Sequence, residues 1–186
     1  MYRGSLVNLR HQSITDMSKL AEFMCTPRYI ETHGNEAPRF TYKEGLEKKY
    51  KERMEKHDHN ELHMVIETID KKVIGAIGIN GNFWKNGLTW IYSFIGDVEY
   101  LEGGYYEEAL DLMLEFLFVE ANARKVKINI QSNDPQGMAA YKTRGFSTEV
   151  VFKEDVLCHG KYIDTYDMVM FKDDYMKTYM KGVVEA

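Results

Sequence analysis

The sequence predicts an α+β fold: a mixed central sheet of about six or seven strands, mostly antiparallel, with helices on both faces. Strand-like and helix-like segments follow one another as strand, two helices, three strands, helix, strand, helix and two strands. This order contains one strand–helix–strand crossover, which requires a parallel pair, whereas the other neighbours can be antiparallel. No linker, repeat or low-complexity block divides the 186 residues. We therefore expect a single domain over 1–186, with a C-terminal tail from about 173 to 186.

The N-terminal part is expected to contain one strand and two helices. Residues 5–10 alternate as a short first strand. Ser13-Ile-Thr-Asp is typical of a helix start. The apolar face of that helix consists of Ile14, Met17, Leu20 and Phe23 or Met24. Residues 27–40 contain Gly, Pro and Asn and predict a loop, and Thr41 precedes a strongly charged helix over about 42–56.

Three strands are expected in the middle of the chain, at 61–69, 72–80 and 88–96. The dipeptide Asp70-Lys71 between the first two predicts a tight hairpin. Asn86-Gly87 precedes the third strand and is a strong turn signal.

The next helix is expected over about 104–121. Its buried face, at the i, i+3, i+4, i+7 spacing, consists of Leu110, Met113, Leu114 and Leu117. The remaining elements are a strand at 125–131, a short helix at about 135–143, and strands at 146–157 and 161–171. The polar tail from Asp173 to Ala186 predicts a terminal helix.

The composition argues against several classes of function. A net charge of −5, from 24 basic and 29 acidic residues without a basic tract, does not favour nucleic-acid binding. Cys25 and Cys158 share no metal-ligand spacing with each other or with the six histidines, so no metal is expected. No apolar run approaches the roughly 18 residues needed to span a bilayer. We expect a soluble, cytoplasmic protein without a membrane partner, and the sheet edges allow a homodimer.

The segment 94–110 has the composition of a phosphate-binding turn. A strand ends, Gly103-Gly104 follows, and a helix begins. The first N–H groups of a helix have no intrahelical acceptor and lie at its positive end, so they bind anions readily. The alternative is a plain connection, which is the more frequent role of a Gly-Gly turn before a helix.

A second segment, 132–146, places Tyr141 on a short helix between two strands. A tyrosine beside a reacting sulfur can donate a proton to a leaving thiolate. The alternative is a partly buried tyrosine that packs on the sheet.

Taken together, the chain resembles the GNAT N-acetyltransferases over about residues 5–175, in particular the branch of ribosomal-protein alanine and spermidine acetyltransferases. Three motifs carry this resemblance: IGDVEYLEGGYYEEAL, AAYKTRGF and HGKYIDTYDMVMFKDDY. They resemble the branch's phosphate loop and helix, its Tyr-x-x-x-Gly-Phe element and its final hairpin.

The resemblance implies that acetyl-CoA, the acyl donor, binds in a gap between two diverging parallel strands, here 88–96 and 125–131. The implied contacts of the pantetheine arm are Phe94, Ile95 and Gly96. The implied contacts of the pyrophosphate are Leu101, Glu102, Gly103, Gly104, Tyr105 and Tyr106. The family's asparagine falls at Asn133 by residue type or at Asp134 by spacing. Tyr141 matches the general acid, and the amine attacks the thioester directly.

Three residues depart from the family pattern. Glu102 and Tyr106 stand where many relatives have small residues, and Trp90 stands where this branch often has a glutamate that acts as base. We expect weakened coenzyme binding. The alternative function is a catalytically weakened GNAT-fold module for binding or regulation.

The acceptor implied by the resemblance is a primary amine: a polyamine-like or antibiotic-like small molecule, or a protein N-terminus. In the family, the region corresponding to 27–40 borders the acceptor site, which makes Glu31, His33 and Glu36 candidate substrate-binding residues. A histidine is a candidate because the imidazole group in general changes charge near neutral pH. The alternative for His33 is a solvated surface side chain.

Overall fold

The computed structural model describes residues 1–33, 41–56 and 60–179, apart from the side chains of 82–84. Its Cα atoms group into two compact units. The first unit joins residues 1–80 to 92–113, and the second joins 81–91 to 114–186. The single domain expected from the sequence remains a prediction.

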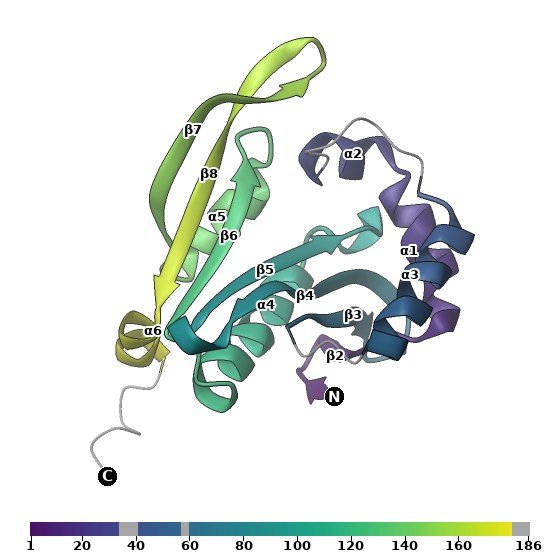
Figure 1. Cartoon of the computed structure of the whole chain (residues 1–186), viewed down its shortest axis with the longest axis horizontal. Helices are drawn as coiled ribbons and strands as arrows, with labels where there is room; N and C mark the ends of the chain where they lie inside the picture. The colour runs from purple at the N-terminus through teal and green to yellow at the C-terminus, as the bar shows by residue number, and fades with distance from the viewer. Residues whose placement is uncertain (34–40, 57–59, 180–186) are drawn as a thin grey trace. The chain divides into compact units, whose positions relative to one another are not determined.

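The strands form an eight-stranded mixed sheet in the order β1-β2-β3-β4-β5-β6-β8-β7 (Figure 1). The parallel pair is β5–β6, and most of the other neighbours are antiparallel. The predicted α+β class with one parallel pair is thus confirmed. The strand count exceeds the prediction because Tyr2–Arg3 forms a strand of two residues, β1, which is too short for periodicity to reveal.

The first unit is built on antiparallel strands. They are β1 (Tyr2–Arg3), β2 (Val7–His11), β3 (Leu62–Thr68), β4 (Val73–Phe83) up to residue 80, and β5 (Leu88–Ile95) from residue 92. The predicted turn at Asp70-Lys71 is confirmed, since Lys71 has φ +65° and its N–H donates to the Thr68 carbonyl (2.8 Å).

Helix α1 (Met17–Met24) begins where Ser13 predicted, after a 3-10 turn over Ile14–Asp16. Asp16 accepts hydrogen bonds from the Ser13 N–H (2.7 Å) and from Arg10 of β2 (2.8 Å). Together these bonds fix the entry of the helix against the strand. Helix α1 buries Met17, Leu20 and Phe23 in a core with Val65, Ala76 and Phe94.

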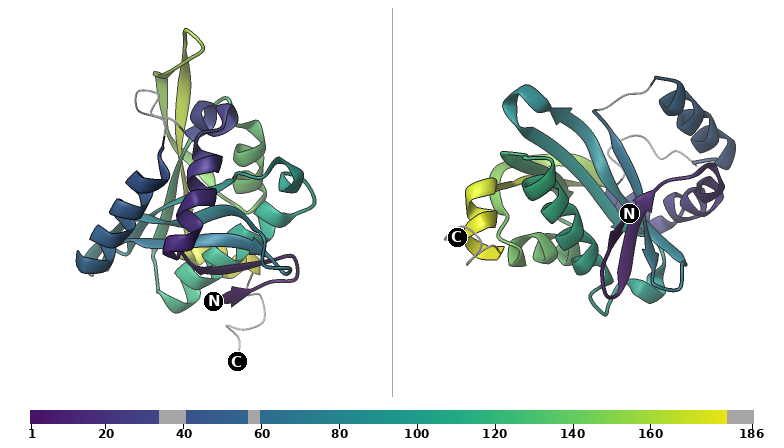
Figure 2. Two further views of the ribbon diagram at one scale, coloured as in Figure 1. Left: turned by 90° about the vertical axis from the view of Figure 1, so that its right-hand side faces the viewer. Right: turned by 90° about the horizontal axis from the view of Figure 1, so that it is seen from below.

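The prediction of a loop over 27–40 is wrong in its first half, because Pro27–His33 form helix α2. Proline is well suited to the first helical position, where its missing N–H costs nothing. The Thr26 hydroxyl accepts from the Tyr29 N–H (3.3 Å), as a capping residue does. Residues 34–40 lie outside the described part of the chain. Helix α3 (Lys43–Lys56) confirms the charged helix and packs beside α1 (Figure 2).

Helix α4 (Tyr105–Glu115) continues as a π-helical turn over Phe116–Glu120, which confirms the predicted helix. Glu108 in its first turn accepts hydrogen bonds from the N–H groups of Ser5, Leu6 and Val7, each 2.7 Å. This carboxylate ties the start of β2 to the helix.

The second unit contains the rest of the sheet and two more helices. Its elements are β6 (Lys125–Gln131), α5 (Pro135–Thr143), β7 (Ser147–Cys158), β8 (Lys161–Phe171) and α6 (Lys172–Tyr179), besides the first half of β5. Helix α6 confirms the terminal helix and stacks Tyr175 on Phe118 (4.8 Å). Strands β5 and β6 pair through three residue pairs, from Leu88↔Lys125 to Trp90↔Lys127.

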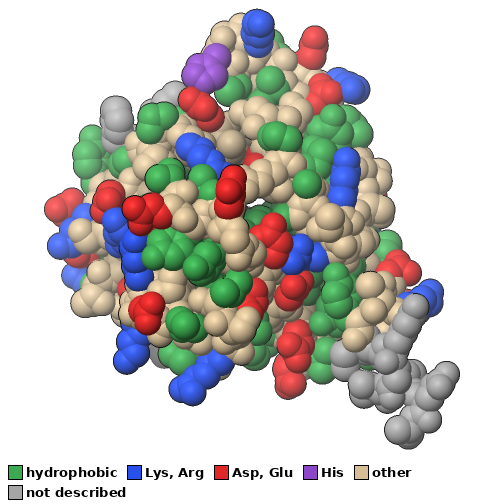
Figure 3. Space-filling model, turned by 180° about the vertical axis from the view of Figure 1, so that it is seen from behind, with side chains coloured by type: hydrophobic (Ala, Val, Ile, Leu, Met, Phe, Trp, Pro, Cys, Tyr) green, Lys and Arg blue, Asp and Glu red, His purple; other side chains and the backbone are tan. Residues whose placement is uncertain are grey.

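Among the described residues, none of the helices is both long and apolar enough to cross a membrane. On the face shown in Figure 3, basic and acidic side chains are interspersed, without a large patch of one sign.

Candidate active site

The connection between β5 and α4 has the predicted order of a strand end, a glycine pair and a helix start. Gly103 and Gly104 adopt φ values of +91° and +87°, a conformation that residues with a Cβ rarely take. Helix α4 begins at the next residue, and its regular ladder starts with the Glu108 N–H on the Gly104 carbonyl (2.9 Å). The backbone N–H groups of this first turn lie at the positive end of an 11-residue helix, where anions bind in many proteins.

Lys72 of the β3–β4 turn supports this loop from one side. Its ammonium lies 3.0 Å from Asp97 and 3.3 Å from Glu99, and 4.6 Å from the centre of the Tyr100 ring. The hydrogen bond to Asp97 is the main reason that the pKa of Lys72 is raised. The sequence did not reveal this residue, because its partners lie more than twenty positions away.

Two of the residues that differ from the family pattern, Glu102 and Tyr106, lie in this connection. Glu102 is exposed, so its charge lies in water, where repulsion of a phosphate is weak. Tyr106 is half-buried, and its hydroxyl lies 2.8 Å from the hydroxyl of Ser93, near the C-terminal end of β5. This hydrogen bond links the first turn of α4 to β5.

The segment Phe94, Ile95 and Gly96 ends β5 against α1 and β4. The N–H of Gly96 donates to the Ile74 carbonyl (2.8 Å) and is already engaged. A Cβ on Gly96 would overlap the Phe23 ring of α1, so glycine is required for this close approach. A ligand arm along this segment would therefore have to use backbone groups other than the Gly96 N–H.

Helix α2 brings His33 to the same segment. The His33 ring stacks on Tyr29 at 4.8 Å, and Tyr29 meets Phe94 edge to face at 4.7 Å. The His33 Nε2 lies 3.2 Å from the Ser93 carbonyl oxygen. Burial raises the pKa of Tyr29 to about 12. Glu31 lies half-buried on the same helix, whereas Glu36 falls outside the described residues.

Sequence reasoning missed a hydrogen-bonded chain that links β3 to β5. The Tyr92 hydroxyl lies 2.7 Å from His63 Nδ1, and His63 Nε2 lies 3.0 Å from the Glu61 carboxylate. Gly78 of β4 is the register partner of His63 and lies between the two strands. A Cβ on Gly78 would come 2.8 Å from the Tyr92 ring, so the bare backbone lets the tyrosine reach across.

The second unit holds the other predicted residues. Asp134 accepts a hydrogen bond from the Gly137 N–H (3.0 Å) and caps α5, while the Asn133 amide donates to Cys158 Sγ (3.5 Å). Tyr141 is only 1% exposed, and its ring packs edge to face on Phe146 at 5.1 Å. Asp134 and Asn133 therefore each have a partner within the protein, and the one held by Asp134 is the backbone of α5.

Trp90 also has a local partner in the second unit. The ammonium of Lys127 lies 4.6 Å from the centre of its ring, a cation–π contact between register partners. Lys127 is held in turn by Glu149 (3.0 Å) and Asp167 (3.6 Å). No cluster of three or more metal-binding side chains occurs within the described ranges 1–33, 41–56 and 60–179.

Comparison with known proteins gives a consistent result. The family model described as an acetyltransferase (GNAT) domain matches residues 7–147. The spermidine N-acetyltransferase from Vibrio cholerae in complex with CoA and spermine is similar in structure, with a TM-score of 0.84 at 20% identity, over 93% of this chain and 99% of that chain. A dodecameric structure of spermidine N-acetyltransferase from the same organism is similar with a TM-score of 0.81 at 20% identity, over 95% of this chain and 99% of that chain. At these identities the structural likeness shows the fold.

Proposed function

Since the acetyltransferase (GNAT) domain model matches residues 7–147, the chain belongs to this family, and we propose that it acetylates a primary amine of a polyamine. The family resemblance predicted from the sequence is confirmed. The chain is accordingly an acetyl-CoA-dependent N-acetyltransferase that acts on an amine. The identity of the acceptor and the roles of individual residues are the proposed part.

The donor site is proposed at the end of β5 and the start of α4. The diphosphate would bind the backbone of Leu101–Tyr106, where the pair of glycines with positive φ precedes the helix N-terminus. The pantetheine arm would run along Phe94–Gly96. The positive φ of Gly103 and Gly104 is the observation that carries this proposal, because it opens the backbone to an anion.

Two further roles are proposed from the family resemblance. Tyr141 would protonate the departing thiolate, and Asn133 would contact the coenzyme by residue type, since Asp134 caps α5. The amine attacks the thioester carbon directly, so the C–N bond forms and the C–S bond breaks without an acyl-enzyme. Holding the two reactants side by side supplies most of the rate enhancement.

A cationic acceptor is favoured by the side chains around α2 and β5. Tyr29, His33 and Phe94 form an aromatic cluster, and Glu31 lies on the same helix. Aromatic faces and carboxylates attract ammonium groups. The Vibrio cholerae structure that is similar to this chain holds spermine, which makes spermidine and spermine the first acceptors to test.

The direct test measures free thiol release by the purified protein from acetyl-CoA, with spermidine, spermine, an aminoglycoside and an N-terminal peptide as acceptors. We expect the highest kcat/KM with a polyamine. A faster reaction with the peptide or the aminoglycoside would contradict the polyamine assignment.

A thermal-shift titration tests the donor site separately. Acetyl-CoA at about 100 times its Kd should add about 2.7 kcal/mol to the free energy of unfolding. A shift without turnover would favour the alternative predicted from the sequence, a catalytically weakened binding module.

Self-association is a further part of the proposal. The similar Vibrio cholerae enzyme is dodecameric. Light scattering at several protein concentrations would distinguish a monomer from the homodimer or a larger assembly.

A further inference from the structure

The structure points to a proton relay for the acceptor amine: we propose that Tyr92, backed by His63 and Glu61, removes the proton that the amine loses on acetylation. This inference rests on the proposed function. It supplies a candidate base, since Trp90 stands where relatives often have a glutamate that acts as base.

The geometry of the relay is continuous. Glu61 Oε2 lies 3.0 Å from His63 Nε2, and His63 Nδ1 lies 2.7 Å from the Tyr92 hydroxyl. A carboxylate can only accept, so Nε2 carries the hydrogen and Nδ1 is left as the acceptor for the phenol. The Tyr92 oxygen keeps a lone pair that can accept a hydrogen bond from an amine.

The backbone of β4 makes this contact possible. His63 and Tyr92 lie on strands that are separated by β4, a span of about 10 Å at the usual strand spacing. Gly78 is the register partner of His63, and a Cβ there would come 2.9 Å from the Tyr92 hydroxyl oxygen. Glycine at this position therefore clears the path between the two side chains.

The charge state of each member suits a relay. Burial is the main cause that lowers the pKa of His63, and Arg53 of α3 acts in the same direction, against the opposing effect of Glu61. His63 is thus neutral at pH 7 and able to accept a proton. Burial raises the pKa of Tyr92, with Arg53 opposing and Tyr29 and Glu61 adding to the rise. Tyr92 therefore remains a phenol that passes a proton on.

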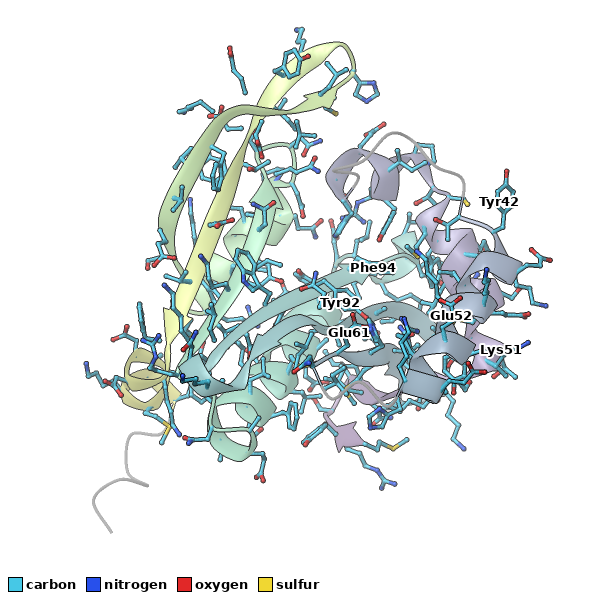
Figure 4. The ribbon with its side chains drawn as sticks, in the orientation of Figure 1. Tyr42, Lys51, Glu52, Glu61, Tyr92 and Phe94 are labelled. Carbon is cyan, nitrogen blue, oxygen red and sulfur yellow. The ribbon has the colours of Figure 1, made fainter. Side chains whose placement is uncertain are left out.

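The relay lies beside the proposed donor site. Tyr92 and Phe94 are two residues apart on β5, so their side chains share a face, and both pack against the core under α1. Figure 4 shows Tyr92, Phe94 and Glu61 along the same stretch of the sheet. The proposed diphosphate site follows the end of β5, so the pantetheine arm runs back along the strand toward Tyr92.

Each proton that moves in the reaction has a donor and an acceptor. As the amine nitrogen bonds to the thioester carbon, its proton moves to the Tyr92 oxygen, and the Tyr92 proton moves to His63 Nδ1. The resulting imidazolium is stabilised by Glu61. The thiolate takes a different proton, from Tyr141 as proposed, and His63 and Tyr141 return to their starting states by exchange with water.

The test compares Tyr92→Phe and His63→Gln with wild type between about pH 5.5 and about pH 9.5, on both sides of the ordinary histidine pKa. Both variants should lower kcat at pH 7 at least tenfold and leave the Kd of acetyl-CoA unchanged. Wild-type kcat should fall as the pH drops through the pKa of His63, below 6.5. Both variants should lose this inflection. Glu61→Gln should lower kcat by a smaller factor.

Matched controls separate a relay from a packing effect. Tyr50→Phe alters another tyrosine packed on the same core, and His11→Gln alters an exposed histidine of β2; both should keep wild-type kcat. Histidine NMR provides a readout besides activity, since Tyr92→Phe should change the titration of His63.

The outcomes distinguish the two proposals. If the wild type is active and kcat is unchanged in Tyr92→Phe and His63→Gln, the relay is overturned and the proposed function stands. The same holds if Tyr50→Phe lowers kcat as much as Tyr92→Phe does. Absence of turnover in the wild type with acetyl-CoA and every amine would overturn the proposed function.

Discussion

Two strand-to-helix connections of this protein begin their helices in opposite ways. After β6, helix α5 starts with Pro135, which has no N–H, and the Asp134 carboxylate accepts from the Gly137 N–H. After β5, helix α4 starts behind Gly103 and Gly104, which have no side chain with which to cap it. The first helix start is capped by a side chain of the protein, whereas the second is where we propose that an external anion binds. The proposed donor site therefore depends on the absence of side chains at Gly103 and Gly104.

We expect the greatest loss of acetyl-CoA affinity when a side chain is added at the turn before α4. Gly104→Val places a β-branched residue at φ +87° and a side chain beside the proposed diphosphate. We expect the Kd of acetyl-CoA to rise about a hundredfold, or about 2.7 kcal/mol. Calorimetric titration measures this value.

Gly160→Val is the matched control, because Gly160 also has a positive φ, +75°, and has nothing within 4 Å of an added Cβ. This variant should bind acetyl-CoA like wild type. An unchanged Kd in Gly104→Val would mean that the diphosphate does not bind at this turn.

The next effect concerns Glu108, whose carboxylate lies in the first turn of α4 and binds the backbone at the start of β2. Glu108→Ala removes the acceptor for three backbone N–H groups, and we expect a loss of about 2 kcal/mol in the free energy of unfolding. Urea denaturation measures this loss. Glu107→Ala, in the same turn, should cost less than half as much, and equal losses would contradict the role of Glu108.

The Glu108 contribution also depends on pH. Burial alone would raise its pKa, but the hydrogen bonds from Ser5, Val7 and Leu6 outweigh this and lower the pKa below 4.5. A depressed folded-state pKa stabilises the protein above the ordinary value and loses that effect as the pH falls through the folded value. The difference in stability between wild type and Glu108→Ala should therefore shrink below pH 4.5.

A smaller effect tests the connection between β6 and α5. Asp134→Ala removes the cap of α5 and should cost about 1 kcal/mol of stability, without a change in acetyl-CoA affinity. Asn133→Ala should instead weaken acetyl-CoA binding and leave the stability unchanged. Thermal melts with and without acetyl-CoA separate the two variants, and weaker binding in Asp134→Ala alone would assign the coenzyme contact to Asp134.

The smallest effect is expected in the connection between β5 and α4. Glu102→Gln removes an exposed negative charge near the proposed diphosphate and should tighten acetyl-CoA binding about two- to threefold. Because salt screens exposed charges, this gain should vanish at high ionic strength. A weaker affinity at low salt would mean that Glu102 contacts the coenzyme favourably.

Local patterns predicted most of the elements. The hairpin at Asp70-Lys71, the helix start at Ser13 and the glycine pair before α4 are each specified by a few neighbouring residues. The prediction failed at Pro27–His33, because Gly, Pro and Asn over 27–40 predict a loop whereas Pro27 begins helix α2. The predicted coenzyme, acceptor and Tyr141 roles came from resemblance, and the residue assignments remain predictions.

Periodicity and turn chemistry act over short distances along the chain, and they predict the fold class, most of the strands and helices, and the glycine pair before α4. Three contacts follow from the folded arrangement instead: Tyr92 with His63, Tyr106 with Ser93, and the Gly137 N–H with Asp134, which makes Asp134 rather than Asn133 the cap of α5. The first two contacts depend on how separate elements come together, and Tyr92–His63 also needs a glycine on the strand between them. No local pattern in the chain encodes such a coincidence of three strands.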